Sequence, residues 1–306
     1  MQLTTDRCPR PREPQRRRPR ITRTSRKGGE RSCRDRSVVS VWKKLLDLLY
    51  PPRCAACGIP EETLLCGRCQ ALVERIRPPF CLRCGLPFDP EAKGGELCAD
   101  CRSAKQPFEM ARAFGRHHGV LRETLHSFKY DRIRALGPVL GKFLLECFDD
   151  SGEKSHSVGG CDGGLRGVES ARLLPSEKLR ASGFDIICPV PLHPVRLRER
   201  GFNQAEVLAG TVSSAVGIGV VEGLERLRLT KPQTGLDPRA RRENVRGAFA
   251  AHTAKVAGRR ILLVDDVWTT GATLVECAKV LTRAKARKVS ILTLTRAAGP
   301  TAPAAI

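Results

Sequence analysis

Short apolar runs and helically spaced apolar residues alternate along most of the chain. The runs predict strands, and the helically spaced positions predict helices. Strands are expected near 111–116, 184–193, 261–264 and 289–294. Helices are expected at 120–128, at 136–148, from about 201 through 212, and from 274 through 281. The run at 261–264 is short, continuous and rich in branched residues, which is typical of a buried parallel strand.

The stretch from Ile261 to Leu274 contains the residues that are the best candidates for binding a ligand. Two adjacent carboxylates, Asp265 and Asp266, follow the strand, and a loop leads from them into the next helix. The loop residues are Thr269, Thr270, Gly271, Ala272 and Thr273. A helix start offers backbone N–H groups and the positive end of the helix dipole to a phosphate. The carboxylates suit ribose hydroxyls, directly or through Mg²⁺, so the stretch predicts a phosphate cradle.

Two further segments are placed to close over a bound phosphate. Val190, Pro191 and Leu192 form a proline-fixed loop at the carboxyl end of the strand at 184–193, where α/β proteins bind ligands. Cations are expected near the leaving pyrophosphate. Three of them, Arg196, Arg198 and Arg200, follow the proline loop. The others, Arg239, Arg241 and Arg242, lie in the stretch at 224–249, which is polar, rich in breakers and expected to be mobile. Three aromatic residues, Phe128, Tyr130 and Phe202, are candidates for stacking on bases if they are exposed.

Eight of the 14 cysteines form an internal repeat. Each unit opens with C-x2-C-G and closes with L-C-x2-C. The cysteines are Cys54, Cys57, Cys66 and Cys69 in the first unit, and Cys81, Cys84, Cys98 and Cys101 in the second. Four thiolates form the closed tetrahedral site of a structural Zn²⁺, and their spacing indicates metal binding in a reducing compartment. Two zinc ions, one in each repeat, are expected, and a single filled site is the alternative.

The chain is strongly basic, with a formal net charge of +22. Residues 1–40 hold 13 basic and 4 acidic residues, so +9 lies there and +13 remains in the other 266 residues. A basic core predicts polyanionic partners such as nucleic acid or phosphorylated ligands; a general bias toward arginine is the alternative. No apolar run reaches about 18 residues, so no membrane span is expected. No apolar segment follows the N-terminus, so a secretory signal is not expected either.

The stretch 261–274 resembles the phosphoribosyl-pyrophosphate (PRPP) motif of type I phosphoribosyltransferases, an apolar strand, two acids, two spacers and a T-T-G-x-T loop. Together with the cysteine repeats, the chain resembles the ComF family over about residues 44–297. The motifs that carry this resemblance are FGRHHGVLRETLHSFKYDR at 114–132, PVPLH at 189–193, RERGFNQAEVLA at 198–209 and PQTGLDPRARRENVRGAF at 232–249. PVPLH, R-G-F-N-Q and the cysteines are more specific to ComF than the PRPP motif is.

The resemblance implies an α/β, phosphoribosyltransferase-like domain, with a parallel sheet flanked by helices, preceded by a small double zinc-ribbon module. The expected organisation is a disordered basic extension at 1–40, the double zinc ribbon at 41–106, the phosphoribosyltransferase-like domain at 107–297 with an insertion at 149–183, and a flexible tail at 298–306. Residues 41–50 are expected to be an amphipathic helix. Residues 1–40 are interpreted as a nucleic-acid arm, a transit-like leader or the product of an upstream start codon.

ComF proteins are associated with the uptake of transforming DNA. The resemblance therefore implies a cytoplasmic protein that binds PRPP with Mg²⁺, contacts single-stranded DNA and partners a DNA-import helicase. Two alternatives stay open: an active phosphoribosyltransferase in nucleobase salvage or nucleoside metabolism, and a nucleotide-sensing regulator that uses the same site. The sequence identifies neither a catalytic residue nor an acceptor pocket, so it leaves open whether the protein is an enzyme.

Overall fold

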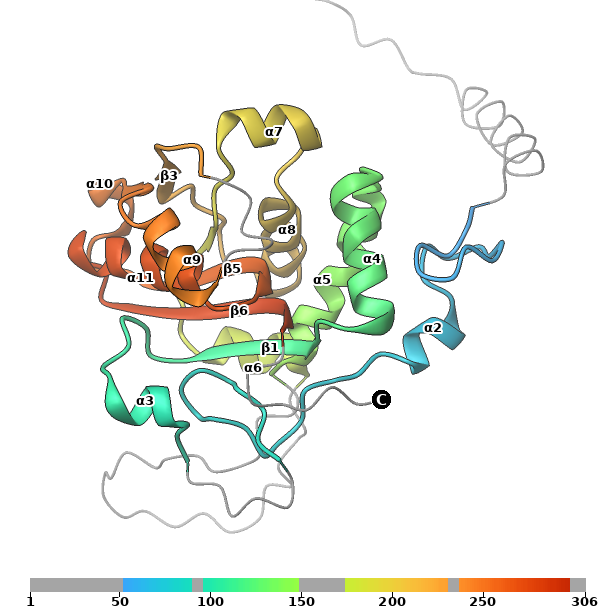
Figure 1. Cartoon of the computed structure of the whole chain (residues 1–306), viewed down its shortest axis with the longest axis horizontal. Coiled ribbons are helices and arrows are strands. Elements are labelled where there is room, and N and C mark those ends of the chain that lie inside the picture. The colour runs from blue at the N-terminus through green and yellow to red at the C-terminus, as the bar shows by residue number, and fades with distance from the viewer. Residues whose placement is uncertain (1–51, 90–95, 149–173, 231–236, 298–306) are drawn as a thin grey trace, which may run out of the picture. The chain divides into compact units, whose positions relative to one another are not determined.

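The computed structural model describes residues 52–89, 96–148, 174–230 and 237–297 (Figure 1). The extension expected at 1–40, the helix expected at 41–50 and the tail expected at 298–306 lie outside these residues. Within them, helices and strands alternate along the α/β part of the chain.

A four-stranded parallel sheet forms the centre of the described structure. Its strands are β1 (Ala111–Arg116), β2 (Ile186–Pro189), β5 (Arg260–Trp268) and β6 (Lys288–Arg296). They lie in the order β1-β6-β5-β2, and every neighbouring pair is parallel. Residues 261–264 are each at most 1% exposed, as expected for a central strand covered on both faces. The sheet order and the flanking helices confirm the α/β class.

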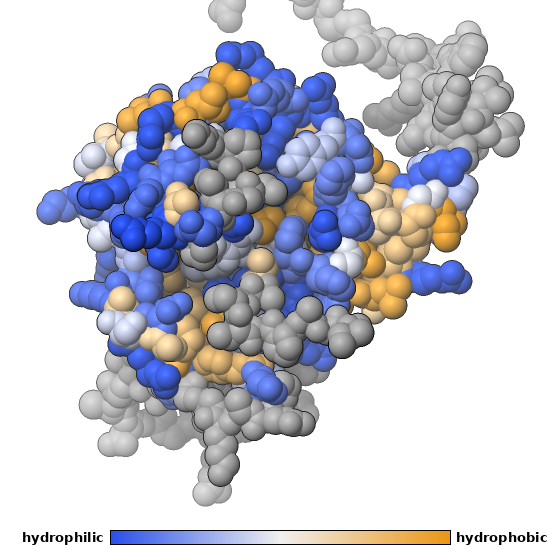
Figure 2. Space-filling model, in the orientation of Figure 1, coloured by the Kyte–Doolittle hydropathy of each residue, from blue (hydrophilic) through white to orange (hydrophobic). Residues whose placement is uncertain are grey.

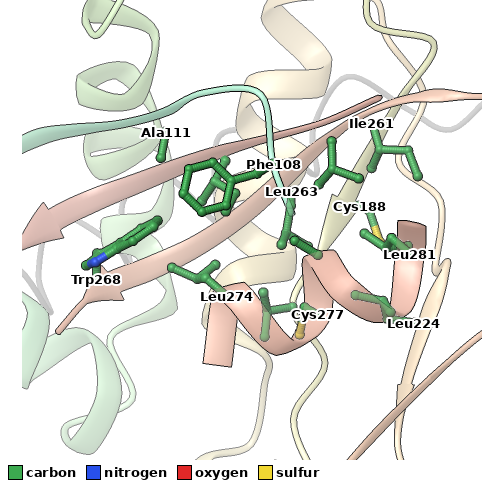
Figure 3. Packing of buried hydrophobic residues seen from close by; sticks show 14 of the residues in the cluster. Phe108, Ala111, Cys188, Leu224, Ile261, Leu263, Trp268, Leu274, Cys277 and Leu281 are labelled. Carbon is green, nitrogen blue, oxygen red and sulfur yellow. The ribbon is translucent and has the colours of Figure 1, made fainter. Parts of the chain in front are cut away.

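Helices cover both faces of this sheet. On one face, Leu262 and Val264 of β5 join the apolar cluster of α4 (Gly119–Tyr130), α5 (Gly137–Glu146), α6 (Pro175–Ala181) and α8 (Gln204–Val216). On the other face, Ile261 and Leu263 join the apolar cluster of α11 (Ala272–Arg283) (Figure 3). Successive strand residues point to opposite faces, so the continuous apolar run in β5 supplies both clusters.

The remaining elements are short and frame the carboxyl ends of the strands and the cysteine repeats. Strands β3 (Leu224–Arg226) and β4 (Phe249–Ala251) form an antiparallel pair. The short helices are α2 (Gly67–Ala71), α3 (Ala99–Ser103), η1 (Arg134–Leu136), α7 (Pro194–Arg200), α9 (Pro238–Val245) and α10 (Thr253–Val256). Among the helices of the described residues, none combines the length and the apolar character that crossing a bilayer requires.

Three details differ from the sequence-based expectations. Strand β5 continues to Trp268, so Asp265 and Asp266 lie within the strand instead of after it. Helix α6 falls inside the insertion expected at 149–183, of which residues 149–173 lie outside the described part. Helix α9 lies within the stretch at 224–249, where no helix was expected, and is 8 residues long. Its start is fixed by Asp237, whose Oδ1 accepts the N–H groups of Arg239 and Ala240 at 2.8 and 2.9 Å.

The cysteine-rich segment is attached along the outer edge of the sheet. Arg75 forms an antiparallel bridge with Gly115 of β1, and the N–H of Ile76 donates to the carbonyl of Phe114 at 2.9 Å. The N–H of Ala111 donates to the carbonyl of Arg83 at 2.7 Å. These bonds satisfy backbone groups that an edge strand would otherwise expose. The segment and the sheet belong to the same compact unit of the chain.

Candidate functional site

Asp265 and Asp266 are the centre of the candidate site, at the carboxyl end of β5. Asp266 is buried, at 8% exposure, and Asp265 is partly buried. The N–H of Asp266 donates to Oδ1 of Asp265 at 2.9 Å, which fixes the orientation of the first carboxylate. Both acids line a cleft of about 470 Å³.

The cleft brings together nine of the site residues expected from the sequence, from three separate segments. They are Asp265, Asp266, Thr269, Thr273, Val190, Pro191, Leu192, Arg196 and Arg200. Seven other residues expected at the phosphate or pyrophosphate do not line it: Thr270, Gly271, Ala272, Arg198, Arg239, Arg241 and Arg242. The carboxyl ends of β2 and β5 are neighbours in the sheet. This adjacency explains why segments so distant in sequence meet there.

The loop after β5 takes its shape from one glycine and one tryptophan. Gly271 has a left-handed backbone, with φ of 75°, and caps the start of α11. A Cβ at Gly271 would lie 2.7 Å from ring atoms of Trp268, so both the conformation and the space favour glycine. Oγ1 of Thr270 accepts the N–H of Ala272 at 3.4 Å. The first turn of α11 thus begins directly after Gly271, with the early helical N–H groups that bind anions.

The proline loop after β2 is held against β5 by backbone and side-chain bonds. The N–H of Val190 donates to the carbonyl of Val264 at 3.0 Å. Nδ2 of Asn203 donates to the carbonyl of Val190 at 3.1 Å, and Oδ1 of Asn203 accepts the N–H of Ala205 at the same distance. Asn203 therefore both caps α8 and anchors the proline loop. The R-G-F-N-Q motif contained this residue, but the sequence alone did not show its role.

Three cations that line the cleft, Lys129, Arg132 and Arg226, were not among the site residues expected from the sequence. Lys129, at the end of α4, forms an ion pair with Asp266, with Nζ 2.9 Å from Oδ2 and only 17% of the lysine side chain exposed. Arg226 of β3 also lines the cleft, and its guanidinium carbon lies 5.2 Å from the centre of the Phe249 ring. Lys129 lies in the F-K-Y-D-R run, whose mixture of aromatic residues and cations suggested either base stacking or a helix end with a rim of long cationic side chains.

The surroundings of Asp265 raise the pKa of its carboxyl group. Burial, and then the charge of Asp266, raise the pKa of Asp265 to about 7, against the opposing effects of the Asp266 N–H, Lys129 and Arg226. Asp265 therefore changes charge near neutral pH in the unliganded protein. A divalent cation or a cationic ligand group between the two acids would favour the fully ionised pair.

The prediction that exposed aromatic residues could stack on bases is wrong for two of the three candidates. Phe128 is fully buried and Phe202 is 8% exposed, and their ring centres lie 5.3 Å apart inside the protein. Both rings are core residues because α4 and the segment before α8 pack against each other. Tyr130 is 61% exposed and lines the cleft, with the guanidinium of Arg200 5.8 Å from its ring centre.

The eight repeat cysteines form two separate clusters, paired within each repeat as expected. In each cluster the four sulfur atoms lie within 4.8 Å of one another. Backbone N–H groups point at the sulfurs; Cys98 N, for example, lies 3.3 Å from Cys81 Sγ. Burial opposes ionisation of Cys54 and Cys81, yet these N–H groups outweigh it and lower their pKa to about 6 and about 7. This donor set fits structural zinc.

Two domain families match separate stretches of the chain. Residues 45–102 match the double zinc ribbon domain, and residues 203–304 match the phosphoribosyl transferase domain. Competence protein F of Haemophilus influenzae is 37% identical over 116 residues, which cover 37% of this chain and 51% of that protein. DNA utilization protein YhgH of Escherichia coli K12 is 38% identical over 133 residues, covering 41% of this chain and 58% of the relative. The chain is therefore similar to proteins named for competence and for DNA utilization.

A third relative, competence protein ComFC of Bacillus subtilis, is 34% identical over 118 residues, covering 36% of this chain and 44% of the relative. The chain thus spans about half the length of the curated relatives it matches. Among solved structures, the purine phosphoribosyltransferase of Pyrococcus horikoshii matches with 24% identity and a TM-score of 0.26, covering 40% of this chain and 67% of that one. That similarity is too low to bear on the fold, which rests on the sheet order and the domain match.

Proposed function

We propose that the cleft binds PRPP together with Mg²⁺. The observation that carries this proposal is the meeting of an acid pair, a helix-starting threonine loop and several cations in one cleft. Asp265 and Asp266 would accept from the ribose hydroxyls or hold the Mg²⁺, which neutralises pyrophosphate charge when bound. The loop 269–273 would receive the 5′-phosphate. The proline loop 190–192, with Arg196 and Arg200, would contact the pyrophosphate.

Calorimetric titration with PRPP tests this proposal. We expect wild-type protein to bind PRPP with Mg²⁺, and the Asp265→Ala/Asp266→Ala double variant to lose Mg²⁺-dependent binding while its circular dichroism stays unchanged. The matched control is Glu61→Ala/Glu62→Ala, which removes two adjacent exposed acids far along the chain and alters the net charge equally. Unchanged PRPP affinity in the Asp265/Asp266 variant would show that the acids have another role.

We further propose a role in DNA uptake, with single-stranded DNA as the polyanionic partner. The support is the relatives, whose names refer to competence and DNA utilization, and the charge of +13 outside residues 1–40. Much of the face in Figure 2 is hydrophilic. Exposed Arg239, Arg242 and Arg246 are placed to contact backbone phosphates. A DNA-import helicase as partner and a cytoplasmic location belong to the same proposal.

A chain lacking residues 1–40, titrated with an oligonucleotide, tests the DNA role. We expect binding that prefers single strands, ignores sequence and weakens steeply with salt, because arginine contacts to phosphates release counterions. Competition by PRPP would put the DNA path over the cleft, whereas additive binding would put it elsewhere on the core. No binding at low salt would remove the DNA role and leave the PRPP site standing.

A second candidate function is phosphoribosyl transfer. It is favoured by the cations Arg196, Arg200 and Lys129, which line the same cleft as the acids and could stabilise departing pyrophosphate. Incubation with PRPP, Mg²⁺ and a panel of purines, pyrimidines and amines would reveal it as pyrophosphate release. Release that requires one acceptor and is lost in the Asp265/Asp266 double variant would establish transfer; PRPP binding without release for any acceptor would favour a binding or sensing role.

A further inference from the structure

Trp268 lies between the phosphate loop and the second cysteine cluster. It ends β5, is 6% exposed, and packs against Phe108 with ring centres 5.7 Å apart and nearly perpendicular planes (Figure 3). One edge of its indole lies directly against Gly271, where an added Cβ would come within 2.7 Å of the ring. A displacement of the indole toward Gly271 would therefore press on Gly271 and on the loop that precedes α11.

Arg296 lies between Trp268 and the second cysteine cluster and contacts both. It is the β6 partner of Trp268 in the strand register, and its guanidinium carbon lies 4.7 Å from the centre of the Trp268 ring. Nη1 of Arg296 donates to the carbonyl of Cys84 at 2.7 Å, and Nη2 lies 3.7 Å from the Cys84 sulfur. Arg296 is 8% exposed, so these contacts are made out of water, where hydrogen bonds to charged groups are strong.

We propose that Arg296 is a positioning residue that makes the second zinc site part of the phosphate-binding apparatus. The proposal rests on the PRPP-binding function of the cleft. When Cys84 ligates zinc, its sulfur and carbonyl are fixed, so the Arg296 fork is fixed as well. The guanidinium then holds the Trp268 indole against Gly271, and the loop 269–273 keeps its anion-binding conformation. Arg296 contacts both the zinc ligand Cys84 and the ring of Trp268. These contacts form a continuous physical connection from the second zinc site to the phosphate loop.

The chain offers a matched control for this arginine. Nη1 of Arg83 donates to the carbonyl of Cys101, a cysteine of the same cluster, at 3.0 Å. Arg83 therefore supports the cluster as Arg296 does, but the described cation–aromatic contact of Trp268 is with Arg296. If Arg296 acted only by stabilising the cluster, replacing either arginine would have the same effect.

The test uses Trp268 as its own reporter. The full chain contains two tryptophans, so Trp42→Phe leaves Trp268 as the sole one. In this background, Arg296→Lys keeps the positive charge but loses the two guanidinium nitrogens that contact Cys84. We expect it to retain zinc, to shift the Trp268 emission and to weaken Mg²⁺-dependent PRPP binding roughly tenfold, the lower end of effects seen for residues that orient metal ligands. Arg83→Lys should change neither emission nor affinity.

A second arm needs no change at Arg296. Cys57→Ser removes a ligand of the first cluster, so chelating the remaining zinc acts on the second. We expect chelation to shift Trp268 emission in that protein and re-addition of zinc to restore it. If wild-type protein binds no PRPP, the proposed function fails, while the emission results still decide the connection. Unchanged emission on both chelation and Arg296→Lys, or equal effects of Arg296→Lys and Arg83→Lys, would overturn the inference.

Discussion

The two cysteine clusters share one sequence pattern but have different surroundings. In the first cluster Cys57 is exposed, whereas all four cysteines of the second are buried. The first belongs to the apolar cluster of α4 and α5, and Oγ of Ser127 on α4 donates to the carbonyl of Ala55 at 3.2 Å. The second belongs to the apolar cluster of α11, next to the phosphate loop. Equal ligand spacing therefore says little about what a metal site supports.

The largest expected difference between the clusters is in stability. Cys101→Ser should lower the unfolding temperature far more than Cys57→Ser. Zinc supplies on the order of 10 kcal/mol of folding free energy in small zinc modules. All four cysteines of the second cluster are buried, so its loss should propagate into the α11 face. The first should unfold locally. Thermal unfolding and elemental analysis of both variants measure this; equal melting temperatures with one zinc lost in each would contradict the comparison.

The glycines that follow the opening C-x2-C sharpen the comparison further. Gly58 and Gly85 have nearly the same left-handed backbone, with φ of 72° and 70°. An added Cβ at Gly58 meets nothing within 4 Å, whereas at Gly85 it would lie 2.7 Å from the carbonyl oxygen of Ala111 in β1. We expect Gly58→Ala to cost about 1 kcal/mol from backbone strain, and Gly85→Ala to cost about 1–3 kcal/mol more from the steric clash.

Denaturant unfolding of the two glycine variants gives these free energies directly. The backbone strain is common to both, so the difference isolates the contact between the second repeat and β1. If the Gly85→Ala protein were no less stable than the Gly58→Ala protein, the backbone around Gly85 would accommodate an added Cβ as easily as the backbone around Gly58 does. That result would contradict the comparison.

The smallest expected effect is on pH dependence, and it belongs to the cleft rather than to either cluster. The pKa of Asp265 is raised to about 7, so folding favours the neutral form of this carboxyl group over the ionised form. The contribution of the neutral form to the stability of the folded protein is lost as pH rises through about 7. Mg²⁺ needs the ionised form. PRPP affinity should therefore increase from about pH 6 to about pH 8 and then level off, as titration calorimetry at several pH values would show.

Lys129→Met should displace this affinity profile to higher pH, because the Lys129 charge lowers the pKa of Asp265. The matched control is Lys142→Met, which removes an exposed lysine from α5. A profile that is flat across neutral pH, or one that moves equally in both lysine variants, would show that Asp265 does not titrate as its surroundings indicate.

The sequence was most informative where one local pattern determines structure. The apolar run 261–264, the threonine loop and the cysteine spacing each predicted elements found in the structure, because strand burial and tetrahedral ligation depend on neighbouring residues. It was least informative where contacts join distant segments. Lys129 meets Asp266 across 137 positions of sequence, and Arg296 meets Cys84 across 212. No periodicity encodes such pairs.

Two errors have local causes that could have been recognised. The stretch after residue 224 looked mobile because of its breakers, yet Asp237 followed by Pro238 is a helix-start signal. Phe128 looked like an exposed stacking residue because cations surround it, yet it falls on the apolar face of α4 with Leu121 and Leu125. Helical periodicity was the better guide there than local composition.

Binding of Mn²⁺ tests the central claim, a divalent-cation-dependent PRPP site at the end of β5, most directly. Mn²⁺ takes the same oxygen ligands as Mg²⁺ and is visible by electron paramagnetic resonance. We predict that wild-type protein with PRPP removes free Mn²⁺ signal beyond what PRPP removes alone, and that Asp265→Ala/Asp266→Ala does not, while Glu61→Ala/Glu62→Ala behaves as wild type. Equal loss of signal in all three proteins, or no loss beyond that caused by PRPP alone, would contradict the account.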